Sequence, residues 1–280
     1  MEQSQPLVWF ITGTSQGFGY ELVRAALQRG DKVAATSRTP AKVAAAFPDA
    51  GGRLLAIQMD LRSEAQIASS IQSAIERFGH IDVLVNNAGH GLLGAIEEAS
   101  DAEVLNIYET NVFGLLRVTR AVAPHLRERR SGHIVNISSI GGLVAGPGWG
   151  IYASTKFAVE GISEALSKEL KPLGISVTAV EPGPFRTDFL GDALAVTQRS
   201  LPAYAATVGR TREWSKTAHG AQAGDPARGA KAIVEAVLAQ EPPTHLLLGT
   251  NAYERAMQKI ADIRGEFETW HTLTVSTDFK

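Results

Sequence analysis

The sequence predicts an α/β protein built on a doubly wound parallel sheet of about seven strands, with helices on both faces. Short apolar runs of strand length alternate along the chain with longer segments of helical periodicity. The apolar runs lack polar–apolar alternation, which is typical of parallel strands buried on both faces. A glycine-rich turn at residues 12–19 joins the first run to the first helical segment, as in many folds of this class.

Composition limits the class of protein. Of the 280 residues, 44% are hydrophobic and 20% are charged, so the chain can bury a sizeable core. No repeat or linker divides it, and we expect a single domain over residues 1–280. The absence of cysteine excludes disulfides and cysteine-bound metals, and the seven histidines show no H-x-x-x-H spacing, so no metal site is expected.

Charge and targeting signals limit the partners. The net charge is −2 with both signs scattered, and the basic cluster at residues 127–130 ends a helical pattern, where it suits the helix dipole. We therefore expect no nucleic-acid partner. The N-terminus does not look like a signal peptide, and no apolar stretch approaches the roughly 20 residues that span a bilayer. A soluble, cytoplasmic protein is expected.

The elements follow from periodicity in chain order. Strands are expected at residues 7–12, 32–37, 54–59, 82–85, 133–137, 176–180 and 245–248. A first helix ends before Gly30, and further helices are expected at residues 63–78, 101–129, 152–171 and 226–240. Ser63 is a suitable N-cap for the helix at 63–78.

Two segments are patterned differently. Residues 184–224 are loosely periodic, with aromatic side chains among polar ones, which predicts a substrate-binding lid. Residues 250–280 form a C-terminal extension that looks helical to about residue 263 and irregular beyond it.

The turn at 12–19 is a candidate dinucleotide-binding loop. Its glycines have the spacing G-x-x-x-G-x-G, which permits a tight turn and a close approach of the backbone to a pyrophosphate. The following helix N-terminus offers free N–H groups to phosphate. The alternative is a glycine-rich turn that binds nothing.

The end of the second strand predicts which nucleotide is preferred. An acidic residue at this place binds the ribose 2′-hydroxyl of NAD, but this chain has Ser37 and Arg38 instead. A guanidinium pairs well with a 2′-phosphate, so NADP(H) is preferred and NAD(H) is the alternative. Arg38 could also be only a solvated surface residue.

Two further strand ends carry polar residues. Asp60 ends the third strand, where it faces an adenine or caps the next helix. Asn86 and Asn87 begin the sequence Asn-Asn-Ala-Gly at the end of the fourth strand, where they either border a ribose or only shape the turn.

A tyrosine and a lysine form the candidate acid/base pair. Tyr152 and Lys156 are four residues apart on a predicted helix and therefore share a face. A nearby ammonium lowers the pKa of a phenol, which can then exchange a proton with an alcohol or carbonyl oxygen. Ser139 follows the fifth strand and could bind the substrate oxygen, and Asn111 could bind a water that relays protons to Lys156. Each feature alone also occurs by chance, and their order along one chain favours catalysis.

These motifs resemble those of the short-chain dehydrogenase/reductase family, in its classical subgroup. The matching segments are TGTSQGFG at 12–19, NNAG at 86–89, Asn111, ISS at 137–139, YASTK at 152–156 and PG at 182–183. VAATSR at 33–38 and the long tail are similar to the branch that includes 17β-hydroxysteroid dehydrogenase-like reductases.

The resemblance implies a Rossmann domain and a role for each matching residue. Tyr152 would be the acid/base, Ser139 rather than Ser138 would bind the substrate oxygen, Lys156 would lower the tyrosine pKa and bind the nicotinamide ribose, and Asn111 would complete a proton relay. The residues expected to contact the cofactor are Gly13, Ser15, Gln16, Gly17, Phe18, Gly19, Ser37, Arg38, Asp60, Leu61, Asn87, Ala88, Gly89, Tyr152, Lys156, Pro182, Gly183 and Thr187.

The expected activity is NADP(H)-dependent interconversion of a ketone or aldehyde and an alcohol. Apolar residues around the expected pocket favour a small hydrophobic substrate: Leu143, Val144, Trp149, Phe185, Phe189 and Leu190. The resemblance also implies a homodimer or homotetramer that packs through the helices at 102–129 and 152–171. The alternatives are a dehydratase or epimerase on the same scaffold and a non-catalytic NADP-binding regulator.

Overall fold

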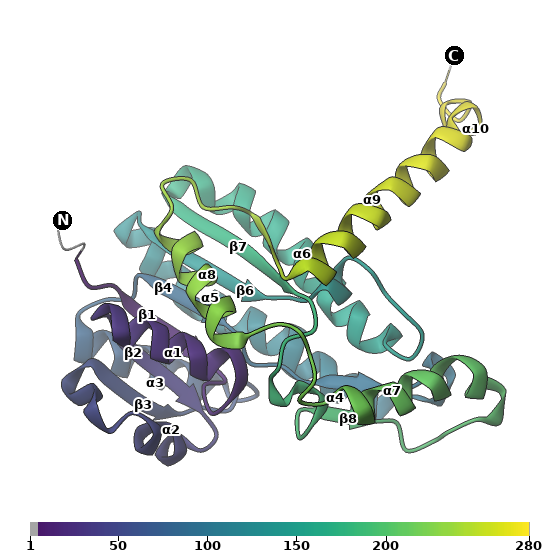
Figure 1. Ribbon diagram of the computed structural model, residues 1–280. Coiled ribbons are helices and arrows are strands. Elements are labelled where there is room, and N and C mark those ends of the chain that lie inside the picture. Colours follow the sequence, from purple (N-terminus) through teal and green to yellow (C-terminus); the bar gives the residue numbers. More distant parts are fainter. Residues whose placement is uncertain (1–4, 280) are drawn as a thin grey trace.

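A computed structural model describes residues 5–279 and contains the predicted doubly wound sheet (Figure 1). Seven parallel strands lie in the order β3-β2-β1-β4-β6-β7-β9. The strands are β1 (Val8–Thr12), β2 (Lys32–Ser37), β3 (Leu54–Gln58), β4 (Val83–Asn86), β6 (Gly132–Ile137), β7 (Ile175–Pro182) and β9 (His245–Leu248). The predicted fold class is therefore confirmed.

Helices cover both faces of the sheet, because successive side chains of a strand point to opposite sides. Trp9 and Ile11 of β1 pack in one core cluster with residues of α1 (Gly17–Arg29) and α8 (Pro226–Leu238). The intervening Phe10 packs in a second cluster on the other face. The helices that contribute to this second cluster are α3 (Glu64–Phe78), α5 (Leu115–Arg129) and α6 (Gly150–Leu170).

The strand order places a crevice at the carboxyl edge of the sheet. The chain passes outward from β1 to β3 and then returns to place β4 on the other side of β1. The loops that follow β1 and β4 therefore diverge, and ligands of doubly wound sheets bind where such loops diverge. The motifs at residues 12–19 and 86–89 both lie at this point.

The helical segment predicted at 101–129 is confirmed, but it contains a π-helical turn. It is divided into α4 (Asp101–Tyr108), a π-helical turn (Glu109–Gly114) and α5. Gly114 faces Leu61, and a β-carbon there would lie 2.9 Å from the Leu61 β-carbon, so the turn brings the backbone close to the loop after β3. The π-helical turn was not predicted, because a single widened turn hardly changes the periodicity of the sequence.

The segment 184–224 contains more structure than its pattern indicates. Its strand β8 (Leu194–Val196) pairs in parallel with β5 (Gly91–Leu93), and neither strand was predicted, because three residues are too few to show a period. The helix α7 (Arg210–Ala218) follows β8 in the same segment.

The shorter helical elements are distributed along the whole chain. They include α2 (Pro40–Ala46) and 3-10 or π-helical turns at Pro48–Arg53, Ile96–Glu98, Ile140–Gly142, Lys171–Leu173, Asp188–Leu190, Pro202–Tyr204 and Ala205–Gly209.

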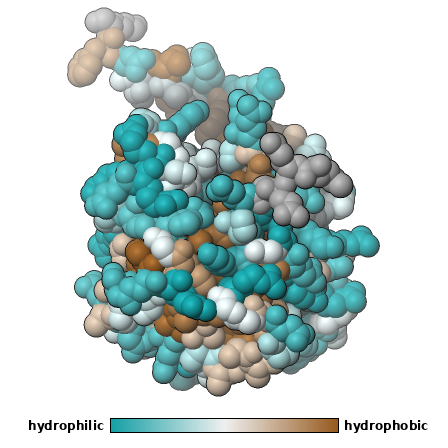
Figure 2. Space-filling model, turned by 90° about the vertical axis from the view of Figure 1, so that its left-hand side faces the viewer, coloured by the Kyte–Doolittle hydropathy of each residue, from teal (hydrophilic) through white to brown (hydrophobic). Residues whose placement is uncertain are grey.

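The C-terminal extension is helical far beyond residue 263, which corrects the sequence-based expectation. Helix α9 (Thr250–Thr269) projects away from the sheet and is followed by α10 (His271–Val275) (Figure 1). Figure 2 shows the end of the chain standing clear of a body whose face is mostly hydrophilic, with apolar residues gathered near its middle. Within residues 5–279, no helix combines the length and the apolar composition needed to cross a bilayer.

Candidate active site

A cleft of about 1210 Å³ lies at the carboxyl edge of the sheet and brings most of the predicted site residues together. Those that line it are Gly13, Ser15, Gln16, Gly17, Phe18, Ser37, Arg38, Asp60, Leu61, Asn87, Ala88, Gly89, Ser139, Tyr152, Lys156, Pro182, Gly183 and Thr187. Gly19 and Asn111 do not line the cleft and lie buried behind its wall.

The glycine-rich loop needs its glycines for two separate reasons. Gly13 and Gly17 have φ angles of +70° and +60°, in the left-handed region that favours glycine. Gly19 has no room for a side chain, because a β-carbon there would collide with the Gly13 carbonyl oxygen and the Asn87 amide. The loop therefore keeps its backbone uncovered toward the cleft.

Hydrogen bonds connect this loop to the end of β4. The Asn87 side-chain amide donates to the carbonyl oxygens of Thr12 and Gly13, at 2.8 and 2.9 Å. In return, the Thr12 hydroxyl accepts the backbone N–H groups of Asn87 and Ala88, at 3.0 and 3.1 Å. The Asn87 side chain thus stabilises the glycine-rich turn, and it also borders the cleft.

The first turn of α1 fits a phosphate. Gln16 occupies the N-cap position without a side-chain cap bond, and the first turn carries no acidic residue. Its N–H groups and the positive end of the helix dipole are therefore available to an anion. Together with the glycine cradle, this arrangement fits the pyrophosphate of a dinucleotide.

The end of β2 presents basic and hydroxyl groups to the cleft. Arg38 lines it, and the Ser37 hydroxyl accepts the backbone N–H of Thr39 at 2.8 Å. Thr39 and Lys42 line the same part of the cleft and were missed from the sequence, although a second cation four residues after Arg38 was a usable signal.

Asp60 shapes the turn after β3 and does not cap the next helix. Its Oδ1 accepts the backbone N–H of Arg62 at 2.9 Å. The N-cap of α3 is Ser63, as predicted, and its hydroxyl accepts the N–H of Gln66. Asp60 is therefore left at the rim of the cleft, with Arg62 beside it.

Tyr152 and Lys156 lie one turn apart near the start of α6, as their spacing predicts. The Lys156 ammonium lies 5.9 Å from the centroid of the Tyr152 ring and donates a 2.8 Å hydrogen bond to the Ile137 carbonyl oxygen. Ser139 lies two residues beyond the end of β6 and begins a 3-10 turn, where its hydroxyl accepts the N–H of Gly141 at 3.0 Å.

Burial dominates the proton affinities of this pair. It raises the pKa of Tyr152 to about 12, against the opposing effect of a hydrogen bond with Ser139. Burial also lowers the pKa of Lys156 to about 8, while the Glu160 carboxylate opposes that change.

The two neighbouring serines have different surroundings. Ser139 faces Tyr152, whereas Ser138 lies beside Glu160 and lowers the pKa of that carboxyl. The structure therefore places the serine that the family resemblance favours next to the phenol.

Asn111 is in the π-helical turn and holds the loop after β4. Its Oδ1 accepts the N–H of His90, and its Nδ2 donates to the His90 carbonyl oxygen and to the Thr155 hydroxyl. His90 itself lines the cleft, and burial lowers its pKa. The Asn111 side chain is thus occupied by protein groups next to Lys156.

The loop after β7 closes the other side of the cleft. Gln16 donates to the Asp188 carboxylate at 3.2 Å, so this loop meets the glycine-rich loop. Phe189 packs against both Trp149 and Tyr152, with ring centroids 6.1 and 5.2 Å apart. An aromatic wall therefore borders the phenol.

The other predicted lining residues differ in place. Val144 and Leu190 line the cleft, while Phe185 also packs against Phe18 at 4.9 Å and belongs to the core. Leu143 packs in a separate cluster near α9 and does not line the cleft, which corrects the prediction. Trp214 and Arg255 do line it, from helices that no sequence motif marked.

Comparison with known proteins agrees with this geometry. The short chain dehydrogenase family matches residues 7–197. Oxidoreductase BOA17 of Botryotinia fuckeliana is 36% identical over 271 residues, which cover 96% of this chain and 98% of that protein. A short-chain dehydrogenase from Streptomyces avermitilis has 40% identity and a TM-score of 0.90, and the match covers 98% of this chain and 100% of that one.

A serine dehydrogenase whose structure contains NADP+ has 29% identity and a TM-score of 0.74, over 86% of this chain and 94% of that one. The family match begins at β1, just before the glycine-rich turn, and ends just after β8, so it contains the sequence motifs from residue 12 to residue 183. The chain belongs to the short-chain dehydrogenase family and is an oxidoreductase.

Proposed function

We propose that the protein is an NADP(H)-dependent carbonyl reductase or alcohol dehydrogenase that acts on a small hydrophobic substrate. The observation that carries the proposal is the arrangement around Tyr152. Its phenol lies with Ser139 and Lys156 in one cleft that also contains the glycine-rich loop.

The chain's own residues account for the proton chemistry. A nicotinamide ring, when bound, supplies or accepts a hydride. Tyr152 gives a proton to the carbonyl oxygen during reduction, or takes one from the alcohol during oxidation. Ser139 binds the same oxygen, and the positive charge of Lys156 lowers the phenol pKa once the cleft is filled.

The preference for NADP(H) rests on the end of β2. Arg38 and Lys42 place two positive charges at the cleft, and no acidic residue replaces them in the segment 37–42. A 2′-phosphate gains charge-assisted hydrogen bonds there, whereas a 2′-hydroxyl lacks its usual acceptor.

The preference for an apolar substrate rests on the aromatic wall. Trp149 and Phe189 stack beside Tyr152, and Val144, Leu190 and Leu194 also line the cleft. Transfer of a hydrophobic ketone from water to such a surface lowers the free energy and therefore favours binding. We expect the segment 184–224 to act as the lid over it.

A homodimer or homotetramer is supported by exposed apolar residues on the helices predicted to pack between subunits. Leu105 of α4, Phe113 of the π-helical turn and Phe157 of α6 are 64%, 41% and 46% exposed. Burial of such residues stabilises association.

A turnover screen tests the proposed function. The purified protein is given NADPH or NADH with ketones of graded size, and loss of reduced nucleotide is followed by absorbance. We expect faster turnover with NADPH and with apolar ketones. Tyr152→Phe should lose about 100- to 10,000-fold in kcat and keep nucleotide affinity within a few-fold. Tight nucleotide binding without turnover of any ketone would instead support a regulator, and a Tyr152→Phe protein near wild-type activity would refute the mechanism.

A further inference from the structure

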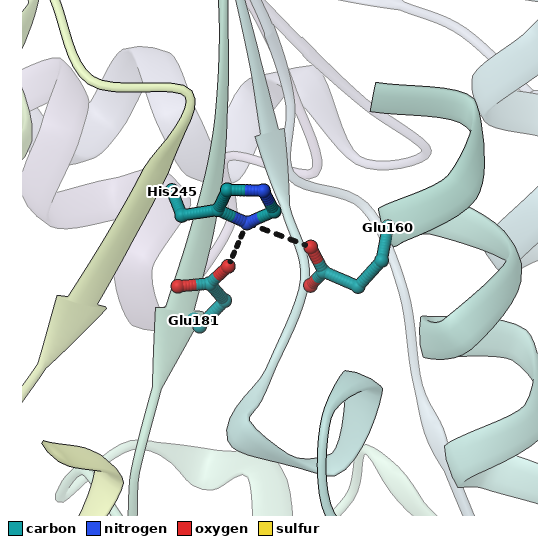
Figure 3. Close-up of side chains that lie close together, drawn as sticks. All are labelled: Glu160, Glu181 and His245. Atoms are coloured by element: carbon teal, nitrogen blue, oxygen red, sulfur yellow. Dashed lines mark hydrogen bonds and ion pairs between the residues drawn. The ribbon is translucent and has the colours of Figure 1, made fainter. Parts of the chain in front are cut away.

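Three ionisable side chains from three separate elements point toward one another (Figure 3). Glu160 comes from α6, Glu181 from β7 and His245 from the edge strand β9. The His245 Nδ1 atom lies 2.7 Å from Glu181 Oε1 and 3.6 Å from Glu160 Oε2. One atom of each side chain lies within 4.8 Å of those of the other two.

The two carboxyl groups are buried. Glu160 is 5% exposed and Glu181 is 0% exposed, whereas the His245 side chain is 42% exposed. Both oxygens of Glu160 and the Oε2 of Glu181 are buried without a partner that meets ordinary hydrogen-bond geometry. Within residues 5–279, His245 is the only basic side chain within ion-pair distance of either carboxyl group.

Two buried carboxylates this close cannot both be ionised without a large cost, because each disfavours the charge of the other and water does not screen them. A proton shared between them gives one oxygen of each carboxyl group a partner and removes one of the charges. Burial and mutual repulsion raise the pKa of Glu160 to about 7, and burial raises that of Glu181 to about 7.

The cluster is connected electrostatically to the candidate catalytic lysine. Glu160 follows Lys156 by one helical turn, so the two side chains share a face of α6. The Glu160 carboxylate raises the pKa of Lys156, which burial otherwise lowers. The Ser138 hydroxyl, next to Ser139, lies near the Glu160 carboxyl, because a β-carbon at Gly142 would lie 2.7 Å from that hydroxyl and 2.9 Å from Glu160 Oε1.

We propose that Glu160 and Glu181 share one proton at neutral pH, and that the single negative charge left on the pair holds Lys156 in its ammonium form. The groups that face the pair are Lys156 and the Ser138 hydroxyl on one side and His245 on the other, with Glu164 lying 3.9 Å from the His245 Nε2. Glu160 and Glu181 are positioning residues that act through Lys156. His245 links the pair to solvent, so that its proton can equilibrate.

The role in turnover rests on the proposed function, but the charge relation does not. NMR of isotope-labelled lysine in the whole protein measures the Lys156 pKa directly, with Lys156→Met to assign the signal. Glu160→Gln and Glu181→Gln each retain one ionisable carboxyl and should leave the pair with its single charge. The double variant removes that charge, and the proton affinity of Lys156 should fall about tenfold. Glu164→Gln, one turn further along α6 and 52% exposed, is the matched control and should change little.

The pH profile gives a second reading. In the double variant the alkaline limb of the turnover profile should move to lower pH, which a merely structural defect would not cause. If the double variant does not fold, infrared spectra of the wild type and the single variants replace it. A protonated-carboxyl band near neutral pH should be present in the wild type and absent from both single variants.

The outcomes separate the two proposals. If the Lys156 pKa shifts in the double variant but the wild-type protein reduces no ketone, the charge relation is supported and the proposed carbonyl reductase activity is rejected. An unchanged Lys156 pKa overturns the charge relation. Stoichiometric zinc binding to the wild type, lost in each single variant, would also overturn it, because the three side chains would then be metal ligands.

Discussion

The side-chain amide of Asn111 exchanges two hydrogen bonds with the backbone of His90, each 3.0 Å long. A third hydrogen bond, 3.1 Å long, joins the same amide to the Thr155 hydroxyl, one residue before Lys156. Asn111 therefore connects the loop after β4, the π-helical turn and α6. These connections hold the loop after β4 against the first turns of α6, so the asparagine has a structural role whether or not it relays protons.

Asn111→Asp should disrupt this connection although the two side chains have the same shape. The change replaces the Nδ2 donor with an oxygen that faces the His90 carbonyl oxygen, and an unsatisfied buried group costs about 1–3 kcal/mol. Thermal unfolding should shift to lower temperature and kcat/KM should fall. Asn251→Asp on the exposed start of α9 is the control. If both variants behave like the wild type, the connection does not matter.

Gly19→Ala should abolish nucleotide binding. The new β-carbon would collide with the Gly13 carbonyl oxygen and the Asn87 amide, so the loop must move away from its binding geometry. Gly161→Ala is a matched control, because Gly161 lies within α6 with open space around it. Alanine should stabilise that helix by up to about 1 kcal/mol. Isothermal titration with NADPH measures the difference in affinity. Equal affinities for both variants would show that nucleotide binding does not depend on the absence of a side chain at Gly19.

Arg38→Ala should weaken NADPH far more than NADH. The change removes a charge-assisted pair with the 2′-phosphate, about 1.5–3 kcal/mol or roughly 10- to 100-fold in affinity, while NADH has no group to lose there. Arg228→Ala, on the exposed start of α8, controls for loss of a positive charge. An equal loss for both nucleotides would reject the 2′-phosphate assignment.

Arg212→Met should loosen the segment 184–224. The guanidinium binds the fully buried Glu98 carboxylate at 2.6 Å and also donates to the Thr197 hydroxyl, joining α7 to the loop after β5. Removing one partner of a buried ion pair costs ~3 kcal/mol, because the other charge is left unpaired. Protease cleavage within residues 197–212 should become faster and KM should rise. Glu98→Gln combined with Arg212→Met should be milder than Arg212→Met alone, and a more severe effect would contradict this explanation.

The same ion pair predicts an acid dependence. The bond to Arg212 lowers the pKa of Glu98 from 4.5 to about 2. A carboxyl whose pKa is lower in the folded state stabilises that state above the unfolded value, and the contribution is lost as the pH falls from 4.5 to about 2. Arg212→Met should remove this part of the acid-unfolding curve.

The buried glutamate pair predicts the opposite dependence at higher pH. The pKa of Glu160 and of Glu181 rises from 4.5 in the unfolded chain to about 7 in the folded one. Their protonated forms favour the folded state below 4.5, and this contribution is lost as the pH rises through about 7. The free energy of unfolding should therefore decline across this range. The decline should be smaller in the Glu160→Gln/Glu181→Gln protein, and identical curves would show that the pair does not titrate there.

Several features were predictable because their signals are local. β2 and β9 have the predicted bounds, because a strand that is buried on both faces appears in the sequence as a continuous apolar run. The spacing of Tyr152 and Lys156 places both on one helix face, whatever the helix packs against. The glycines at 13 and 17 mark backbone angles that other residues avoid. The fold class, the glycine-rich turn and the placement of Tyr152 beside Lys156 therefore followed from the sequence by itself.

Only the tertiary structure decided which side chains meet across elements. Local sequence periodicity does not predict three features of the fold: the π-helical turn at Glu109–Gly114, the pairing of β5 with β8 and the length of α9. Ser138 and Ser139 are adjacent in sequence, yet one faces Glu160 and the other Tyr152. Glu160, Glu181 and His245 are brought together by α6, β7 and β9, because burial and register, rather than sequence distance, determine the electrostatic neighbours of a charge.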